Sequence, residues 1–109
     1  MGMLTILVNS GVRGFGEMLK SALPAGCFRV ETAEPGRSFL EAAGRTRPDI
    51  AVIDFSGGRG RTAELESDLL RAIRPDVRII PVGRSPAGPV ADIERWIRWS
   101  LAGKAASRI

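Results

Sequence analysis

Residues 49–58 read DIAVIDFSGG, in which an unbroken apolar run ends at a carboxylate and passes directly into a glycine loop. A short apolar run without polar alternation is typical of a strand that is buried on both faces of a parallel sheet. Asp54 would then lie at the carboxyl end of that strand, which is the edge where such sheets bind ligands. The residue either caps a loop or is held there for chemistry.

On both sides of this strand, other short apolar runs alternate with stretches of helical spacing. Further strands are predicted at residues 4–8 (LTILV), 28–31 (FRVE) and 77–82 (VRIIPV). Helices are predicted between and after them from apolar residues three or four positions apart, such as Phe15, Met18, Leu19 and Ala22; Phe39, Leu40 and Ala43; and Leu65, Leu69 and Ile73. Four such alternations predict an α/β three-layer sandwich with a mainly parallel sheet, four strands and four helices.

Length and composition predict one globular domain. The chain has 109 residues, 44% of them hydrophobic and 26% charged, which is an ordinary balance for a folded domain. We expect a single domain over residues 1–103 and a frayed tail at 104–109. Cys27 is the only cysteine and there is no histidine, which excludes an intrachain disulfide, a structural zinc site and a Ser-His hydrolase. No run approaches the length of a membrane helix and no signal-peptide pattern is present, so a cytoplasmic location is expected.

The basic balance raises the alternative of a nucleic-acid partner. The formal net charge is +4 and the sequence pI is about 10.5. The basic residues are nearly all arginines, but they are scattered in small groups and aromatic residues are only 6%. A nucleic-acid-associated regulator therefore stays the alternative prediction, and it would bind in a steeply salt-dependent way.

Polar and small residues follow the predicted strands where chemistry is expected. They are Asn9 and Ser10 after the first strand, Asp54 and Ser56 after the third, and Gly83 and Arg84 after the fourth. The loop SGGRGR (56–61) could cradle a phosphate with its backbone amides. It matches no Walker or dinucleotide fingerprint, however, and a connecting loop is the preferred interpretation.

Over residues 4–83 the chain resembles the receiver domain of bacterial response regulators. The matching pieces are ILVNS, RVETAEPGRSFLEAAGRTRPDIAVIDF and RPDVRIIPVG, of which RPDIAVID is the most specific. The resemblance implies that Asp54 occupies the position that accepts a phosphoryl group from a histidine kinase. It also implies partners of that pathway: a histidine kinase, a phosphotransfer protein or an output regulator.

Other functional positions differ from the family pattern. The acidic pair that binds magnesium in receivers is replaced by Asn9 and Ser10, the hydroxyl residue after the fourth strand by Gly83, and the fifth strand with its Lys has no counterpart. Asp54 alone is a weak magnesium ligand, so no cofactor is expected unless magnesium binds there. Phosphoryl transfer would be slow or absent unless Arg59, Arg61 or Arg84 supplies the missing cation. We therefore expect an atypical receiver-like domain, not an enzyme, that acts mainly through protein–protein interaction, with Asp54 as a candidate phospho-acceptor.

The last helix and the fourth strand indicate self-association. Val90, Ile93, Ile97 and Leu101 share one helix face with Trp96 at its margin, and Trp99 points nearly the opposite way. An exposed tryptophan is a common interface anchor, although it can also lie on its own helix beside an arginine. Without a fifth strand, the order 2-1-3-4 leaves the fourth strand at an edge, where Pro81 removes a hydrogen-bond donor. We expect a homodimer through the fourth strand, the final helix or both, with no membrane partner.

Overall fold

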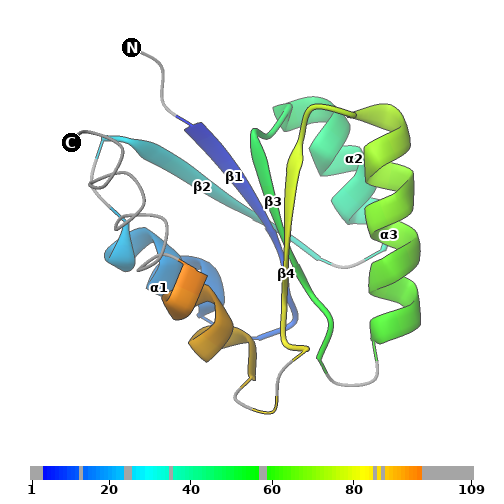
Figure 1. Ribbon diagram of the computed structural model, residues 1–109. Helices are drawn as coiled ribbons and strands as arrows, with labels where there is room; N and C mark the ends of the chain where they lie inside the picture. Colours follow the sequence, from blue (N-terminus) through cyan, green and yellow to red (C-terminus); the bar gives the residue numbers. More distant parts are fainter. Residues whose placement is uncertain are drawn as a thin grey trace, which may run out of the picture.

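The computed structural model describes residues 4–12, 14–23, 26–34, 36–56, 59–84, 86 and 88–96. Within these residues, four parallel strands form one sheet in the order β2-β1-β3-β4 with helices on both faces (Figure 1). The elements are β1 (Leu4–Asn9), α1 (Phe15–Ala22), β2 (Phe28–Ala33), α2 (Arg37–Thr46), β3 (Ile50–Asp54), α3 (Gly60–Ile73), β4 (Arg78–Val82) and a helical segment at 88–96. The predicted α/β three-layer sandwich and its strand order are confirmed.

The stretch that opens with Asp49 sets the register of the sheet. All five residues of β3 are buried, as expected for a central strand between β1 and β4. Just before β3, the Asp49 carboxylate accepts a hydrogen bond from the Thr5 N–H at 2.8 Å, and the Asp49 N–H donates to the Thr5 carbonyl at 2.9 Å. On the other side, the Asp49 carbonyl accepts from the Arg78 N–H at 3.0 Å. One aspartate therefore fixes β1 and β4 against β3.

Two apolar cores lie on opposite faces of the sheet because successive strand residues point to opposite sides. One core joins α1 and the 88–96 segment to the sheet, and α2 and α3 cover the other face (Figure 1). The first core contains Ile6, Val8, Phe15, Leu19, Val52, Val82 and Ile93 among others. The second contains Leu7, Phe39, Ala43, Ala51, Ile53, Ala63 and Leu70 among others.

The third helix turns its regular apolar repeat outward. The spacing of Leu65, Leu69 and Ile73 correctly predicts a helix, but all three side chains are exposed. The buried residues of α3 are instead Ala63, Glu66, Ser67 and Leu70. Small side chains on this side suit close packing of the helix against the sheet.

The fourth strand lies at an edge of the sheet, as its proline indicated. Among the described residues β4 pairs only with β3, and Pro81 stands opposite Ile53 in the register. The second strand is longer than predicted, because its pairing with β1 continues to Ala33. The carboxyl ends of the strands point to one end of the molecule, which is the lower end in Figure 1.

Candidate functional site

Asp54 ends β3 and its carboxylate is already hydrogen-bonded. The residue is only 2% exposed. Its Oδ2 accepts a hydrogen bond from the Ser10 hydroxyl at 3.0 Å, and its Oδ1 accepts one from the Ser56 N–H at 2.8 Å. The Ser10 Oγ in turn accepts from the Val12 N–H at 3.1 Å. The carboxylate therefore connects the loop after β1 to the loop after β3.

Gly83, directly after β4, packs against the same carboxylate. Its φ is +82°, in the left-handed region that favours glycine, and a Cβ at this position would lie 2.5 Å from Asp54 Oδ1 and 2.9 Å from Ser56 N. The Gly83 N–H donates to Asp92 Oδ2 of the 88–96 segment at 2.8 Å. A side chain at this position would collide with the hydrogen-bonded carboxylate, which explains glycine here.

Asn9 lies beside Ser10 in the sequence but turns toward a different group. It shares the face of β1 that carries Leu7, it is fully buried, and its Nδ2 donates to Glu66 Oε2 at 3.0 Å. Within the described part of the chain, the buried Asn9 Oδ1 has no hydrogen-bond partner. Of the two residues at the acidic-pair positions, only Ser10 hydrogen-bonds the Asp54 side chain.

Glu66 is the site residue that the sequence reasoning missed. It lies on the buried side of α3 with 3% exposure. Besides the Asn9 amide, it accepts the Gly36 N–H at 2.7 Å and forms a 2.7 Å salt bridge with Arg59 Nη2. Arg59 Nη1 also donates to the Asp54 carbonyl at 2.9 Å. This network joins the ends of β1 and β3 to the loop before α2.

A sequence signal for Glu66 existed. Glu66 follows Ala63 by three positions and precedes Leu70 by four, so the three residues share one side of a helix. A buried carboxylate requires a partner, and an arginine stands seven positions earlier. The signal was masked by the more regular repeat of leucines on the other side.

The side chains at the strand ends do not fit a magnesium ion. Among the described residues, no three His, Cys, Asp or Glu side chains come close enough to hold a metal. Magnesium favours octahedral oxygen coordination that includes one or two carboxylates. Both oxygens of Asp54 already accept hydrogen bonds, and the Glu66 carboxylate is neutralised by Arg59.

The remaining arginines near the strand ends have other contacts. Arg84 lies over the ring of Phe55, with its guanidinium carbon 4.2 Å from the ring centroid, as in a cation–π pair. Both residues line a cavity of about 140 Å³ between α3 and β4, together with Pro81. Arg61 is exposed on the first turn of α3. Of the three arginines expected to replace a missing cation, Arg59 and Arg84 are therefore engaged elsewhere.

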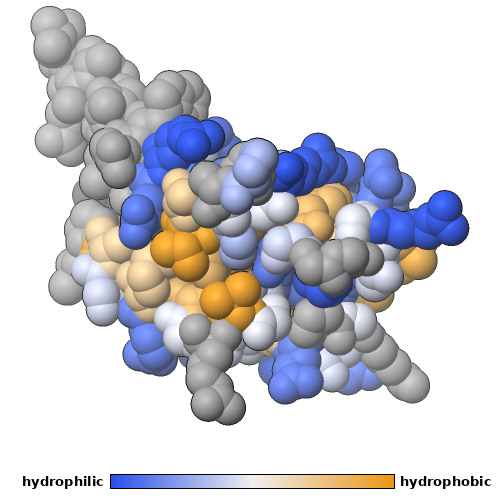
Figure 2. All heavy atoms as spheres, turned by 90° about the horizontal axis from the view of Figure 1, so that it is seen from below, coloured by the Kyte–Doolittle hydropathy of each residue, from blue (hydrophilic) through white to orange (hydrophobic). Residues whose placement is uncertain are grey.

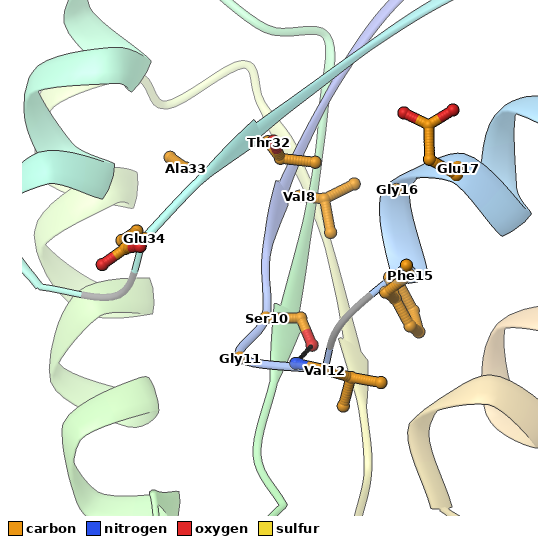
Figure 3. Close-up of a pocket in the computed structure, with 11 residues that line it drawn as sticks. Val8, Ser10, Gly11, Val12, Phe15, Gly16, Glu17, Thr32, Ala33 and Glu34 are labelled. Carbon is orange, nitrogen blue, oxygen red and sulfur yellow. Dashed lines mark hydrogen bonds between the residues drawn. The ribbon is translucent and has the colours of Figure 1, made fainter.

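A larger cavity of about 510 Å³ opens beside the site, between the turn after β1 and the end of β2. Val8, Val12 and Phe15 give it an apolar wall, and Ser10 is the residue that it shares with the Asp54 network (Figure 3). The carboxylates of Glu17 and Glu34 come from different elements and point away from each other. The described lining includes no cationic side chain.

The residues predicted to form an interface have different surroundings. Trp96 is half-buried against the first core, and its buried Nε1 has no hydrogen-bond partner among the described residues. Pro81 is exposed at the edge of the sheet, and Trp99 lies outside the described residues. At the end of the molecule where the strands finish, apolar atoms gather near the middle of the surface (Figure 2). Val12 and Val90, from the loop after β1 and from the 88–96 segment, are exposed by 38% and 37%.

No helix in the described part of the chain is long and apolar enough to span a membrane. Comparisons with known proteins give no match: no family model, curated protein or solved structure matches this chain.

Proposed function

We propose that this chain is a receiver-like domain of bacterial two-component signalling that acts in the cytoplasm by binding a protein partner. Asp54 serves in it as a structural residue and not as a phospho-acceptor. The partner is a histidine kinase, a phosphotransfer protein or an output regulator, which recognises the folded surface without a phosphoryl signal.

The hydrogen bonding of Asp54 carries this proposal. Phosphoryl transfer needs an accessible nucleophile and cations placed where negative charge develops. Asp54 is 2% exposed, and both of its oxygens accept hydrogen bonds. Arg59, which reaches the Asp54 carbonyl, neutralises Glu66 and is not available as that cation. The arrangement stabilises loops and gives little support for group transfer.

Phosphorylation assays test the proposal directly. The protein is incubated with magnesium and acetyl phosphate, and separately with a phosphorylated histidine kinase, beside a typical receiver as positive control. We expect the intact mass to stay unchanged and the amide spectrum to show no response to beryllofluoride. A phosphoryl group that appears on the wild type and not on Asp54→Asn would overturn the proposal.

A pair of substitutions separates a structural role of Asp54 from a chemical one. Asparagine can still accept the Ser56 N–H and can donate to the Ser10 hydroxyl, whereas alanine removes both contacts. In the bacterium that carries the gene, Asp54→Asn should signal like the wild type and Asp54→Ala should be destabilised. An Asp54→Asn protein that folds normally but does not signal would contradict a structural role.

The alternative of an arginine-rich nucleic-acid surface has less support from the side-chain contacts. Arg29 pairs with Glu31, Arg59 with Glu66 and Arg71 with Asp68. These ion pairs reduce the positive charge available for phosphates. Tight DNA binding that weakens steeply with salt would favour the alternative.

A further inference from the structure

The outer edge of β2 carries backbone groups that no described part of the chain pairs. β2 forms the edge of the sheet opposite to β4, and among the described residues it pairs only with β1 (Figure 1). The Leu4 N–H donates to the Cys27 carbonyl at 3.1 Å, which sets the backbone groups of the odd-numbered residues toward β1. The even-numbered residues therefore turn their N–H and carbonyl groups outward; they are Phe28, Val30 and Thr32. Such an unpaired edge is a template for a strand of another chain.

The edge of β4 is a poorer template than the edge of β2. The Arg78 N–H and the Val82 carbonyl form hydrogen bonds on the β3 side, so the alternate residues of β4 turn their backbone groups outward. Pro81 is one of these residues and has no N–H. The next outward N–H, that of Gly83, donates to Asp92. The outward residues of β2 include no proline, so each of them offers both a donor and an acceptor.

The charged side chains of β2 lie on a face that is open beside this edge. Val30 points into the first core, so Arg29 and Glu31 lie on the opposite face of the sheet, that of α2. Arg29 Nη2 lies 2.9 Å from Glu31 Oε1, and the two side chains are 66% and 29% exposed. Both border a cavity of about 310 Å³, together with Arg45 near the end of α2. This face therefore has room for the side chains of a second chain next to the edge.

The order of residues along β2 is complementary to itself in the antiparallel direction. In a pair of strands centred on Val30, Phe28 of each copy lies opposite Thr32 of the other, so all the outward donors and acceptors are matched. The same register places Arg29 of each copy directly opposite Glu31 of the other, at a position where cross-strand side chains lie close together. A pair centred on Arg29 or on Glu31 would instead oppose two like charges, which is unfavourable. Hydrogen bonding and charge therefore favour one register.

We propose that β2 forms the interface of a homodimer, in which two β2 strands pair antiparallel around a two-fold axis at Val30 and join the two sheets into one. Backbone hydrogen bonds hold the strands together, and the opposed charges of Arg29 and Glu31 select the register. Because both copies use the same edge, the assembly closes as a dimer. It places self-association at the other edge of the sheet from β4. This inference goes beyond the proposed function and holds whether or not the chain acts in signalling.

Charge reversal tests the register, with sedimentation of the full chain from micromolar to millimolar concentrations as the measurement. The wild type should show a monomer–dimer equilibrium. Arg29→Glu and Glu31→Arg should each weaken dimerisation by about tenfold, because each variant opposes like charges across the interface. An equimolar mixture of the two variants should dimerise like the wild type, because every acidic side chain of one variant then faces a basic side chain of the other.

The matched controls reverse the charges of an exposed ion pair on α3. Arg71→Glu and Asp68→Arg change the net charge by the same amounts, and they should dimerise like the wild type both alone and mixed. A wild type that stays monomeric at millimolar concentration overturns the proposal. So does a mixture of the two β2 variants that dimerises no better than either variant alone.

Disulfide formation tests the antiparallel direction. In the proposed register, Cys27 of each copy lies opposite Ala33 of the other, at a separation that suits a disulfide. Under mild oxidation, Ala33→Cys should therefore form a covalent dimer through the exposed native Cys27. The control combines Ala33→Cys with Cys27→Ser and should cross-link poorly, because its two thiols lie about 20 Å apart along the paired strands. Absence of the covalent dimer, or equal cross-linking of both proteins, overturns the arrangement, and circular dichroism confirms that each variant is folded.

Discussion

At the scale of single residues, the position of the Asp54 carboxylate requires a residue without a side chain at position 83. The carboxylate fills the space where any other residue at position 83 would place its Cβ. It also accepts hydrogen bonds from the Ser10 hydroxyl in the loop after β1 and from the Ser56 N–H in the loop after β3. A hydroxyl residue at position 83, as in typical receivers, is incompatible with this packing.

Gly83→Ala should therefore lower the free energy of unfolding by about 3 kcal/mol, the sum of left-handed backbone strain and overpacking. Gly26→Ala is the matched control, because Gly26 has nearly the same φ, +83°, and no non-adjacent atom of the described residues lies within 4 Å of its added Cβ. The control should lose only about 1 kcal/mol, from backbone strain alone. Urea unfolding of both variants gives the comparison, and equal losses would mean that the contact with Asp54 costs nothing.

At the scale of elements, α3 is apolar on two sides. Ala63 and Leu70 are buried against the sheet, whereas Leu65, Leu69 and Ile73 are exposed. The side that carries Ala63 is buried because this small residue lets the helix approach the sheet closely. Glu66 also reaches its partners only from this side.

Truncating a leucine to alanine should lower the unfolding free energy strongly on the buried side of α3 and hardly at all on the exposed side. Leu70→Ala should cost about 3 kcal/mol of unfolding free energy because it leaves a cavity in the core. Leu65→Ala, at 59% exposure, should change it by less than about 0.5 kcal/mol. Thermal and urea unfolding are measured at a concentration at which sedimentation shows a monomer, so that dimer formation does not contribute. A larger loss from Leu65→Ala would mean that Leu65 is buried within the single chain.

At the scale of the whole molecule, Glu66 joins segments that are far apart in the sequence. Its carboxylate holds Asn9 at the end of β1, Gly36 before α2 and Arg59 before α3. These contacts gather the carboxyl end of the sheet around one buried charge. Removing one partner of a buried ion pair leaves the others without compensation.

Glu66→Ala should lower the unfolding free energy by about 3 kcal/mol, because Arg59 and the Asn9 amide lose their acceptor. Glu66→Gln should cost less, since its carbonyl can still accept one of the three donors. Glu94→Ala, an exposed glutamate in the 88–96 segment, is the control and should be nearly neutral. Exchange of the Gly36 backbone amide, which donates to Glu66, should rise in Glu66→Ala. Protection unchanged at this amide would show that Glu66 does not hold the loop before α2.

The sequence by itself determined the order of the elements and the place of Asp54. The apolar run IAVI predicted a central strand because only a strand covered on both faces has no polar alternation. The acidic residue after it then had to lie at the carboxyl end of the sheet. Pro81 likewise predicted an edge strand, because proline cannot donate to a neighbouring strand.

Only the tertiary structure decided which side of α3 is buried and what Asp54 contacts. Helical periodicity shows which side of a helix is buried only where the helix has a single apolar side, and α3 has two. The contacts among Asp54, Ser10 and Gly83 join residues from three strand ends, and their distances depend on how the strands are staggered. Spacing along a chain is local, whereas packing and hydrogen bonding across a sheet are set by neighbours distant in sequence.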